Sequence, residues 1–287
     1  MRLPFDVLAS LFMAFCLLVL FASHRLAHGP DSYRRVQQQG TSFFLGLNLM
    51  NAGYWMLQPI VRWCSRSGVT PAMVTWCSLV PAAAAAISAA TGHWGVAAWC
   101  LLAAALLDVV DGAVARTTGE ASAAGAVLDS VLDRYAEFIF FAGVVVYYRN
   151  DLPAQLVTLA AVLGSFLISY SSAKAEALQL APPRGPMKRS DRLALLVVAT
   201  AVTPFSLHWL ESSPRHYAWP VLVAVTVIAV LANASAIQRF TALAQAAGER
   251  SARESKGRPP ARRRDESAGT RPSRPSPARP VTRDVTS

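Results

Sequence analysis

Long apolar segments, separated by short polar turns, alternate along most of the 287-residue chain. A predominantly apolar run of about 20 residues is long enough to cross the hydrocarbon core of a membrane as one helix. We therefore expect an all-α polytopic membrane protein, whose many Ala and Gly residues let its helices pack closely. The pattern predicts six core spans, at 71–91, 94–115, 123–148, 153–174, 192–210 and 218–236.

Another apolar run, 7–22, lies near the start of the chain. It is either a secretory signal peptide or a retained membrane anchor, and no convincing small-residue cleavage site follows it. More arginines follow the run than precede it, so the positive-inside rule places its C-terminal end in the cytoplasm. We expect residues 1–40 to form an N-terminal membrane anchor and a cytoplasmic linker.

The next segment, 43–66, mixes aromatic and aliphatic side chains with Asn, Gln and Arg. This mixture is typical of a helix lying in the membrane interface, although a packed linker helix would have the same composition. The sequence G-V-T-P that follows predicts a turn and a helix start, with Thr70 as the N-cap and Pro71 in the first helical position. We assign 41–69 to an interfacial or juxtamembrane helix and 70–243 to the six-span domain.

The chain carries 27 Lys and Arg against 17 Asp and Glu, a formal net charge of +10. Residues 244–287 hold 11 of these cations and 5 of the acids, which gives this segment alone a net charge of +6. The segment is rich in Pro, Arg and Ser and has almost no large apolar side chain, so it cannot form a core. We expect a disordered basic cytoplasmic tail, which either contacts anionic membrane lipids or only aids solubility. Nothing in it indicates nucleic-acid binding.

The loops of the core also differ in charge from one side to the other. The loops on the opposite side of the core from the cationic loops have only Arg149 and Arg215. The cationic loops carry Arg116, Lys174, Arg184, Lys188, Arg189 and Arg192. Because cytoplasmic loops carry the excess of Lys and Arg, this side is predicted to face the cytoplasm. We therefore expect a multi-pass protein of the cell (inner) membrane.

Four carboxylates lie inside segments that are apolar enough for a bilayer. Asp108 and Asp111 are three residues apart, and Asp129 and Asp133 are four apart, so each pair shares one helix face. A short polar turn between the pairs makes their helices neighbours, with the acids at similar depth. Converging carboxylates suit a hard cation such as Mg²⁺ or Mn²⁺. A buried ion-pair network is the alternative, but intramembrane acids more often mark a functional site.

Small and basic residues are spaced among these acids in a fixed pattern: D-x-x-D-G-x-x-A-R, eight further residues, then G-x-x-x-D-x-x-x-D. Gly112 and Gly125 would let a nucleotide or diphosphate approach the backbone, and the guanidinium of Arg116 suits phosphate oxygens. With every fixed position filled, the pattern resembles the signature of the membrane-embedded CDP-alcohol phosphatidyltransferases. The G-x-T-P sequence before the first core helix extends this resemblance.

The resemblance implies a six-helix transmembrane CDP-alcohol phosphatidyltransferase core, here with an N-terminal anchor helix and an interfacial helix added. It implies metal-dependent transfer of a phosphatidyl group from CDP-diacylglycerol to a hydroxyl acceptor with release of CMP, often by a homodimer. Asp133 would be the catalytic base. The metal ligands, for two Mg²⁺ or Mn²⁺ ions, would be Asp108, Asp111, Asp129 and Asp133. The nucleotide and diphosphate contacts would be Gly112, Ala115, Arg116, Ser122 and Gly125.

Four cations fall near the same end of the bundle as the acids: Lys174, Arg189, Arg192 and Arg239. They suit an acceptor that itself carries phosphate, although ordinary flanking charge would look alike. The segments ISYSSAKAEA (168–177) and RSDR (189–192) and the Q-R pair ending at Arg239 resemble the phosphatidylinositol phosphate synthase branch of the family. This resemblance implies inositol 1-phosphate as the acceptor. The chain departs from the branch at Ser172, Lys174 and Lys188, where the branch has Lys, Arg and Glu.

Other functions remain open on the sequence alone. A phosphatidylglycerophosphate synthase would use glycerol 3-phosphate, and a CDP-aminoalcohol phosphotransferase would use a different nucleotide donor. An ion-coupled membrane transporter could also place acids in the bilayer, but it would not need the Gly112, Arg116 and Gly125 arrangement. A prenyltransferase also uses membrane Asp clusters with Mg²⁺, but through different Asp-rich motifs. Release of CMP distinguishes the phosphatidyltransferase from both.

Overall fold

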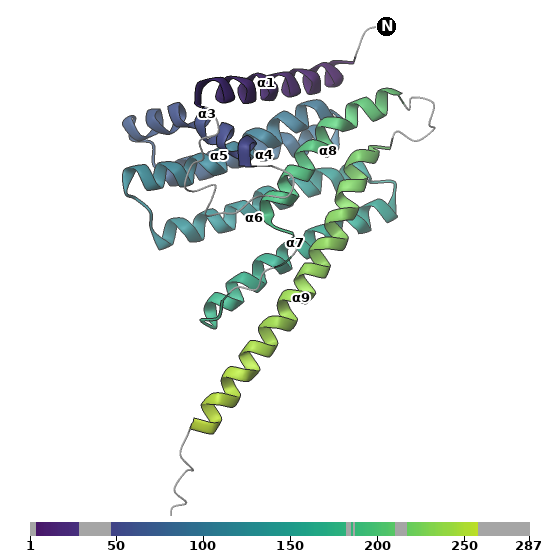
Figure 1. Ribbon diagram of the computed structural model, residues 1–287. Helices are drawn as coiled ribbons and strands as arrows, with labels where there is room; N and C mark the ends of the chain where they lie inside the picture. Colours follow the sequence, from purple (N-terminus) through teal and green to yellow (C-terminus); the bar gives the residue numbers. More distant parts are fainter. Residues whose placement is uncertain (1–3, 29–46, 182–184, 186, 210–216, 258–287) are drawn as a thin grey trace, which may run out of the picture. The chain divides into compact units, whose positions relative to one another are not determined.

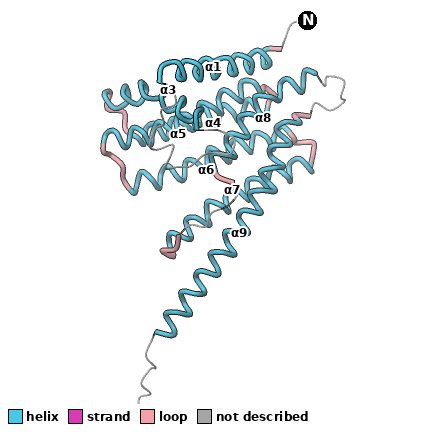
Figure 2. Tube along the Cα trace, viewed as in Figure 1, coloured by secondary structure: helices cyan, strands magenta, loops and turns pink. Residues whose placement is uncertain are grey.

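The computed structural model describes residues 4–28, 47–181, 185, 187–209 and 217–257. These residues form eight helices and no strand, which confirms the all-α prediction (Figures 1 and 2). The helices are α1 (Phe5–His28), α3 (Leu47–Arg66), α4 (Pro71–Ala90), α5 (Trp94–Thr118), α6 (Ala123–Tyr147), α7 (Leu152–Ala177), α8 (Arg189–Trp209) and α9 (Trp219–Gly257).

Six of the described helices are long and apolar enough to cross a membrane, namely α1, α4, α5, α7, α8 and α9. The protein is therefore a multi-pass membrane protein. Five of the six predicted core spans are in this set, and the sixth corresponds to α6. That helix has 25 residues, enough to cross a bilayer at about 1.5 Å per residue. It is not among the six apolar helices because it carries too many charged side chains, namely Asp129, Asp133, Arg134 and Glu137.

The start of α4 has the cap that the sequence predicts. The Thr70 side chain accepts the N–H of Met73 over 3.3 Å, and Pro71 is the first residue of the helix. A hydroxyl at this position satisfies one of the N–H groups that the first turn of a helix leaves unpaired. This local signal fixes where the core begins.

Small residues let the core helices approach closely. A Cβ added to Gly143 of α6 would lie 2.3 Å from the carbonyl oxygen of Ala86 on α4. Helices α7 and α9 meet in the same way, because a Cβ at Gly164 would lie 2.7 Å from Nδ2 of Asn233. The Asn233 amide donates to the carbonyl oxygen of Ala160 over 2.8 Å. Packing through small residues is thus confirmed at these two contacts.

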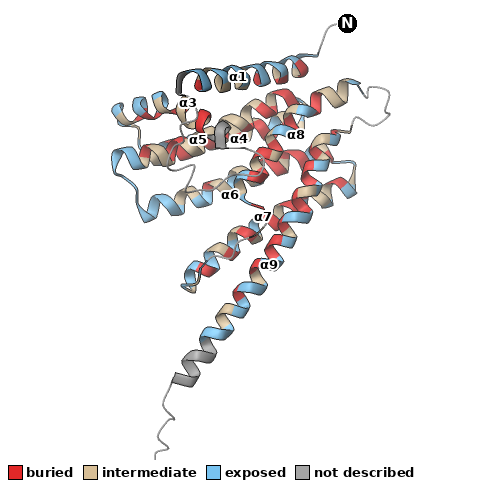
Figure 3. Ribbon diagram, in the orientation of Figure 1, coloured by how far each residue is buried: buried red, intermediate tan, exposed pale blue. Residues whose placement is uncertain are grey.

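Helix α1, the predicted anchor, packs against α3, α5 and α8. It buries one face that includes Val7 and Met13, while much of its remaining surface is exposed (Figure 3). At its start, Oδ1 of Asp6 accepts the N–H of Gly95 over 3.1 Å, and Oδ2 lies 3.2 Å from Nδ1 of His93. The Asp6 carboxylate therefore binds the N-terminus of α5. The orientation of α1 in a membrane stays a prediction.

Helix α3 corresponds to the predicted interfacial helix, whose first residues, 43–46, lie outside the described part of the chain. Its side chains Leu57 and Val61 pack in one buried cluster with Val110 and Val114 of α5. This agrees with a packed helix, and a place in the membrane interface stays a prediction.

The chain divides into two compact units, Met1–Ala247 and Gly248–Ser287, and α9 begins in the first and ends at Gly257 in the second. The prediction that a disordered tail begins at residue 244 is wrong, because α9 continues to Gly257. The sequence from 244 to 257 is rich in Ala, Gln, Glu, Arg and Lys, which favour a helix without any tertiary packing. The rest of the predicted tail, 258–287, lies outside the described residues.

Candidate active site

Three of the four motif acids meet at the junction of α5 and α6. Asp108 of α5 and Asp129 and Asp133 of α6 each offer a carboxylate oxygen, and these oxygens lie within 4.8 Å of one another. The chain reverses between the two helices at Gly119, whose φ of 74° belongs to the left-handed region that glycine adopts easily. The helical spacing and the short turn thus bring the acids together, as the sequence predicts.

Asp111 lies outside this group of three. It is buried, one of its oxygens accepts the N–H of Gly112, and it interacts with the side chain of Thr75. Its second oxygen, Oδ2, is buried without a partner among the described residues, and the same is true of Oδ1 of Asp129. Both acids line one cleft.

This open cleft lies between the first turn of α4, the end of α5 and the start of α6. Asp111 and Asp129 line it, and Thr75 of α4 is among its other lining residues. All five residues that the sequence predicts to contact a nucleotide and diphosphate line it: Gly112, Ala115, Arg116, Ser122 and Gly125.

Gly112 and Gly125 have local reasons to be small. A Cβ at Gly112 would lie 3.1 Å from Nη1 of Arg116, so glycine leaves room for that guanidinium over the helix. Ser122 is the N-cap of α6 and accepts the N–H of Gly125 over 3.1 Å, and a Cβ at Gly125 would lie 3.2 Å from its Oγ. The N-terminus of α6 and the Arg116 side chain therefore border the same cleft, which suits an anion.

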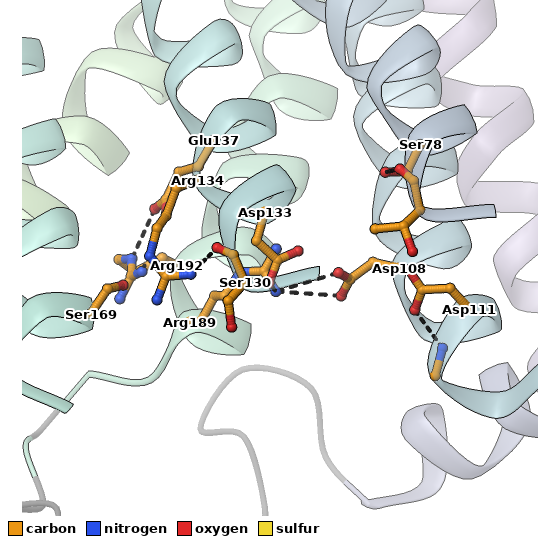
Figure 4. A network of polar contacts seen from close by, with 12 residues as sticks. Ser78, Asp108, Asp111, Ser130, Asp133, Arg134, Glu137, Ser169, Arg189 and Arg192 are labelled. Carbon is orange, nitrogen blue, oxygen red and sulfur yellow. Dashed lines mark hydrogen bonds and ion pairs between the residues drawn. The ribbon is translucent and has the colours of Figure 1, made fainter. Parts of the chain in front are cut away.

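Arg189, at the start of α8, lies between the acids of the two helices (Figure 4). Its Nη1 is 3.4 Å from Oδ1 of Asp108 and also contacts the Asp133 carboxylate. The three side chains line a second pocket together with Glu137 and Ser78, and its other lining residues are apolar. Arg189 is thus a counter-charge for the acids, a role that the sequence analysis did not assign to it.

The other three predicted acceptor residues lie in two different environments. Arg192 and Arg239 are buried, and they are close enough for their charges to repel. Nη1 of Arg239 donates to Oγ of Ser172 over 3.3 Å, which joins α9 to α7. Lys174, in contrast, is exposed on α7. The structure therefore groups two of the four predicted acceptor cations with each other.

Residues 68–231 match the sequence model of a family described as CDP-alcohol phosphatidyltransferase, which is more than half of the chain. The chain belongs to the CDP-alcohol phosphatidyltransferase family. It is therefore a phosphotransferase of phospholipid biosynthesis, as the motif predicted.

Known members of this family resemble the chain over most of their own length. Phosphatidylinositol phosphate synthase of Mycobacteroides abscessus is 33% identical over 189 residues, which cover 63% of this chain and 82% of that protein. The crystal structure of the Mycobacterium tuberculosis phosphatidylinositol phosphate synthase with CDP-DAG bound has a TM-score of 0.57 at 29% identity, covering 64% of this chain and 92% of that one. The structure of the same enzyme in complex with manganese and citrate has a TM-score of 0.57 at 28% identity, with 64% and 87% covered.

Two residues near the phosphatidyltransferase motif were missed by the sequence analysis. Thr75 lies one turn into α4 and lines the same cleft as Asp111, which brings together segments far apart in the sequence. Glu137 lies four residues after Asp133, and this spacing puts it on the same face of α6. That spacing was the available signal for Glu137, but its partner Arg192 belongs to another helix.

Proposed function

We propose that this phosphatidyltransferase moves the phosphatidyl group of CDP-diacylglycerol to inositol 1-phosphate and releases CMP. The observation that carries the acceptor assignment is the pair of buried arginines. Arg192 Nη1 and Arg239 Nε are buried, with no partner among the residues described. A buried charge requires a counter-charge, and a phosphate group matches the donor geometry of a guanidinium. The name of the M. abscessus relative supports the same acceptor.

We further propose that the reaction depends on Mg²⁺ or Mn²⁺, bound as two ions by Asp108, Asp111, Asp129 and Asp133. The donor set fits, because it consists of carboxylate oxygens, and two of them are buried without partners among the described residues. The solved relative in complex with manganese also supports this assignment. Such ions polarise the phosphorus under attack and stabilise the negative charge of the leaving CMP.

The side chains of the site have distinct tasks in this proposal. The N–H groups at the start of α6 and the guanidinium of Arg116 bind the diphosphate of the lipid donor. Gly112, Ala115, Ser122 and Gly125 line the cleft for the cytidine. Asp133 accepts the proton of the attacking hydroxyl. The hydroxyl oxygen forms a bond to the phosphatidyl phosphorus as the P–O bond to CMP breaks, so no covalent enzyme intermediate is needed.

The membrane setting is part of the proposal. The excess of Lys and Arg near the acidic end of the bundle supports an active site that opens to the cytoplasm from the inner membrane. We propose a homodimer, the assembly that the family resemblance implies. Light scattering of the purified protein in detergent, after subtraction of the detergent mass, tests this assembly.

The decisive experiment is CMP release by purified protein in detergent with CDP-diacylglycerol and either Mg²⁺ or Mn²⁺. The acceptor panel contains inositol 1-phosphate, inositol, glycerol 3-phosphate and serine, with a metal-free reaction containing chelator beside each. We expect release with inositol 1-phosphate alone, and only with metal. Release with glycerol 3-phosphate would identify a phosphatidylglycerophosphate synthase and overturn the acceptor assignment, while release in the presence of chelator would overturn the metal dependence.

A further inference from the structure

Glu137 forms a partly buried ion pair with Arg192 that joins α6 to α8. Nε of Arg192 donates to Oε1 of Glu137 over 3.1 Å, and Nη2 donates to Oε2 over 3.5 Å. The side chains are 13% exposed for Glu137 and 2% for Arg192. Figure 4 shows the two side chains pointing toward each other beside Asp133 and Arg189. The carboxylate thus takes one edge of the guanidinium and fixes its plane.

The Glu137–Arg192 pair lies one helical turn along α6 from a similar contact, the one between Asp133 and Arg189. Asp133 and Glu137 are four residues apart on α6, and Arg189 and Arg192 are three apart on α8. Arg189 contacts Asp133, and Arg192 contacts Glu137. Helices α6 and α8 are therefore joined by two successive acid–arginine contacts. A change in the Glu137–Arg192 pair thus lies next to the contact between Asp133 and Arg189.

The contact with Glu137 leaves one guanidinium nitrogen of Arg192 for another group. Nη1 is buried without a partner among the described residues, and so is Nε of the nearby Arg239. Two neighbouring buried cations repel each other unless anions are present, and Glu137 supplies one negative charge. A ligand phosphate between the two guanidinium groups would supply the remaining negative charge. It would accept hydrogen bonds from Arg192 Nη1 and Arg239 Nε.

We propose that Glu137 is a positioning residue, which holds Arg192 so that its Nη1 edge faces the phosphate of the acceptor. This inference rests on the proposed function, since it assumes a phosphorylated acceptor. Glu137 touches neither substrate nor metal in this arrangement. It acts through Arg192, so its removal affects the binding of the acceptor and leaves the binding of the lipid donor intact.

The test is a steady-state comparison of Glu137→Gln and Glu137→Asp with the wild-type enzyme, with KM measured separately for each substrate. Gln keeps the size but loses the charge, so KM for inositol 1-phosphate should rise about tenfold, the order expected for one charge-assisted hydrogen bond. KM for CDP-diacylglycerol should change less than about twofold. Asp keeps the carboxylate and should restore part of the loss. Glu249→Gln, the same change at an exposed position on α9, is the matched control and should leave both constants unchanged.

A double-mutant cycle with Arg192→Gln separates this role from general electrostatics. If Glu137 acts through Arg192, the double variant should be no worse than Arg192→Gln alone, because the effects of coupled residues do not add. Additive effects would overturn the proposal. A lower KM for the acceptor in Glu137→Gln would also overturn it, since that result would mean that Glu137 only weakens anion binding. Equal rises in both KM values would indicate a structural role and would overturn it as well.

Failure of the proposed function is recognised separately. If the wild-type enzyme uses another phosphorylated acceptor in the panel, the cycle is measured with that acceptor, and the positioning role stands or falls on the same criteria. If it uses only inositol or serine, which carry no phosphate, both inferences are wrong. If no acceptor supports CMP release, binding of inorganic phosphate to the wild-type protein and to Glu137→Gln is compared by calorimetry. Equal affinity there would overturn the positioning role.

Discussion

Arg189 lies between Asp108 and Asp133, with its Nη1 3.4 Å from Oδ1 of Asp108 and in contact with the Asp133 carboxylate. These are two of the three acids whose oxygens converge within 4.8 Å. The guanidinium therefore lies against the same oxygens that we propose for a divalent cation. A fixed positive charge at this distance lowers the attraction of the acids for a second cation.

Replacement of Arg189 by Gln should therefore tighten metal binding. We expect the affinity for Mn²⁺ to rise several-fold, because a cation beside two of the ligands is removed while the ligands remain. Electron paramagnetic resonance of free Mn²⁺, titrated with protein in detergent, measures this without any need for turnover. The matched control is Arg149→Gln, an exposed arginine in the loop after α6, which should bind Mn²⁺ as the wild-type protein does. Unchanged or weaker binding in Arg189→Gln would contradict the argument.

Asp133→Asn should abolish most turnover and leave the lipid donor bound. An amide cannot accept the proton of the attacking hydroxyl, and general-base catalysis contributes about 10²–10⁴-fold. The cytidine cleft, in contrast, is lined by Asp129 and Asp111 and not by Asp133. Turnover is measured as CMP release, and donor binding is measured as equilibrium binding of CDP-diacylglycerol in detergent. Turnover close to that of the wild-type enzyme would remove Asp133 from the role of base.

The sequence was sufficient for those parts of the site that follow from helical spacing. Asp108, Asp129 and Asp133 converge because their positions along two helices and a short turn determine which faces meet. Thr70 was informative for a similar reason, since a capping hydroxyl acts on a residue only three positions away. Such local relationships need no knowledge of how the remaining helices pack.

Contacts between helices that are distant in sequence could not be predicted in this way. Arg189 was expected to contact the acceptor, which stays a prediction; its contact with Asp108 depends on the packing of α8 against α5. The pairing of Glu137 with Arg192 depends on the same packing. The end of α9 was missed for a different reason, since absence of apolar side chains was taken as absence of helix.

Gly143→Ala should destabilise the core, although Ala usually favours a helix. A Cβ at this position would lie 2.3 Å from the backbone carbonyl oxygen of Ala86, and backbone cannot move aside cheaply. Overpacking of this kind costs about 1–3 kcal/mol. Gly53→Ala on α3 is the matched control, because nothing lies within 4 Å of its added Cβ. That variant should gain about 0.5–1 kcal/mol from helix propensity. Thermal unfolding of both variants in detergent should therefore shift in opposite directions, and a loss of stability in Gly53→Ala would contradict the steric explanation.

Ser172→Lys should tighten binding of a phosphorylated acceptor. Ser172 accepts a hydrogen bond from Nη1 of Arg239 over 3.3 Å, so a lysine there would add an ammonium group beside one of the two buried arginines. We expect KM for inositol 1-phosphate to fall several-fold at low ionic strength and the difference to shrink with added salt, because screening weakens charge–charge attraction. Ser172→Ala removes the same hydrogen bond without adding charge, and its KM should rise slightly or stay unchanged. Both variants should bind CDP-diacylglycerol as the wild-type enzyme does. A fall in KM for the lipid donor of the same size would mean that the added charge acts on the whole site, and the assignment of Arg239 to the acceptor would then be wrong.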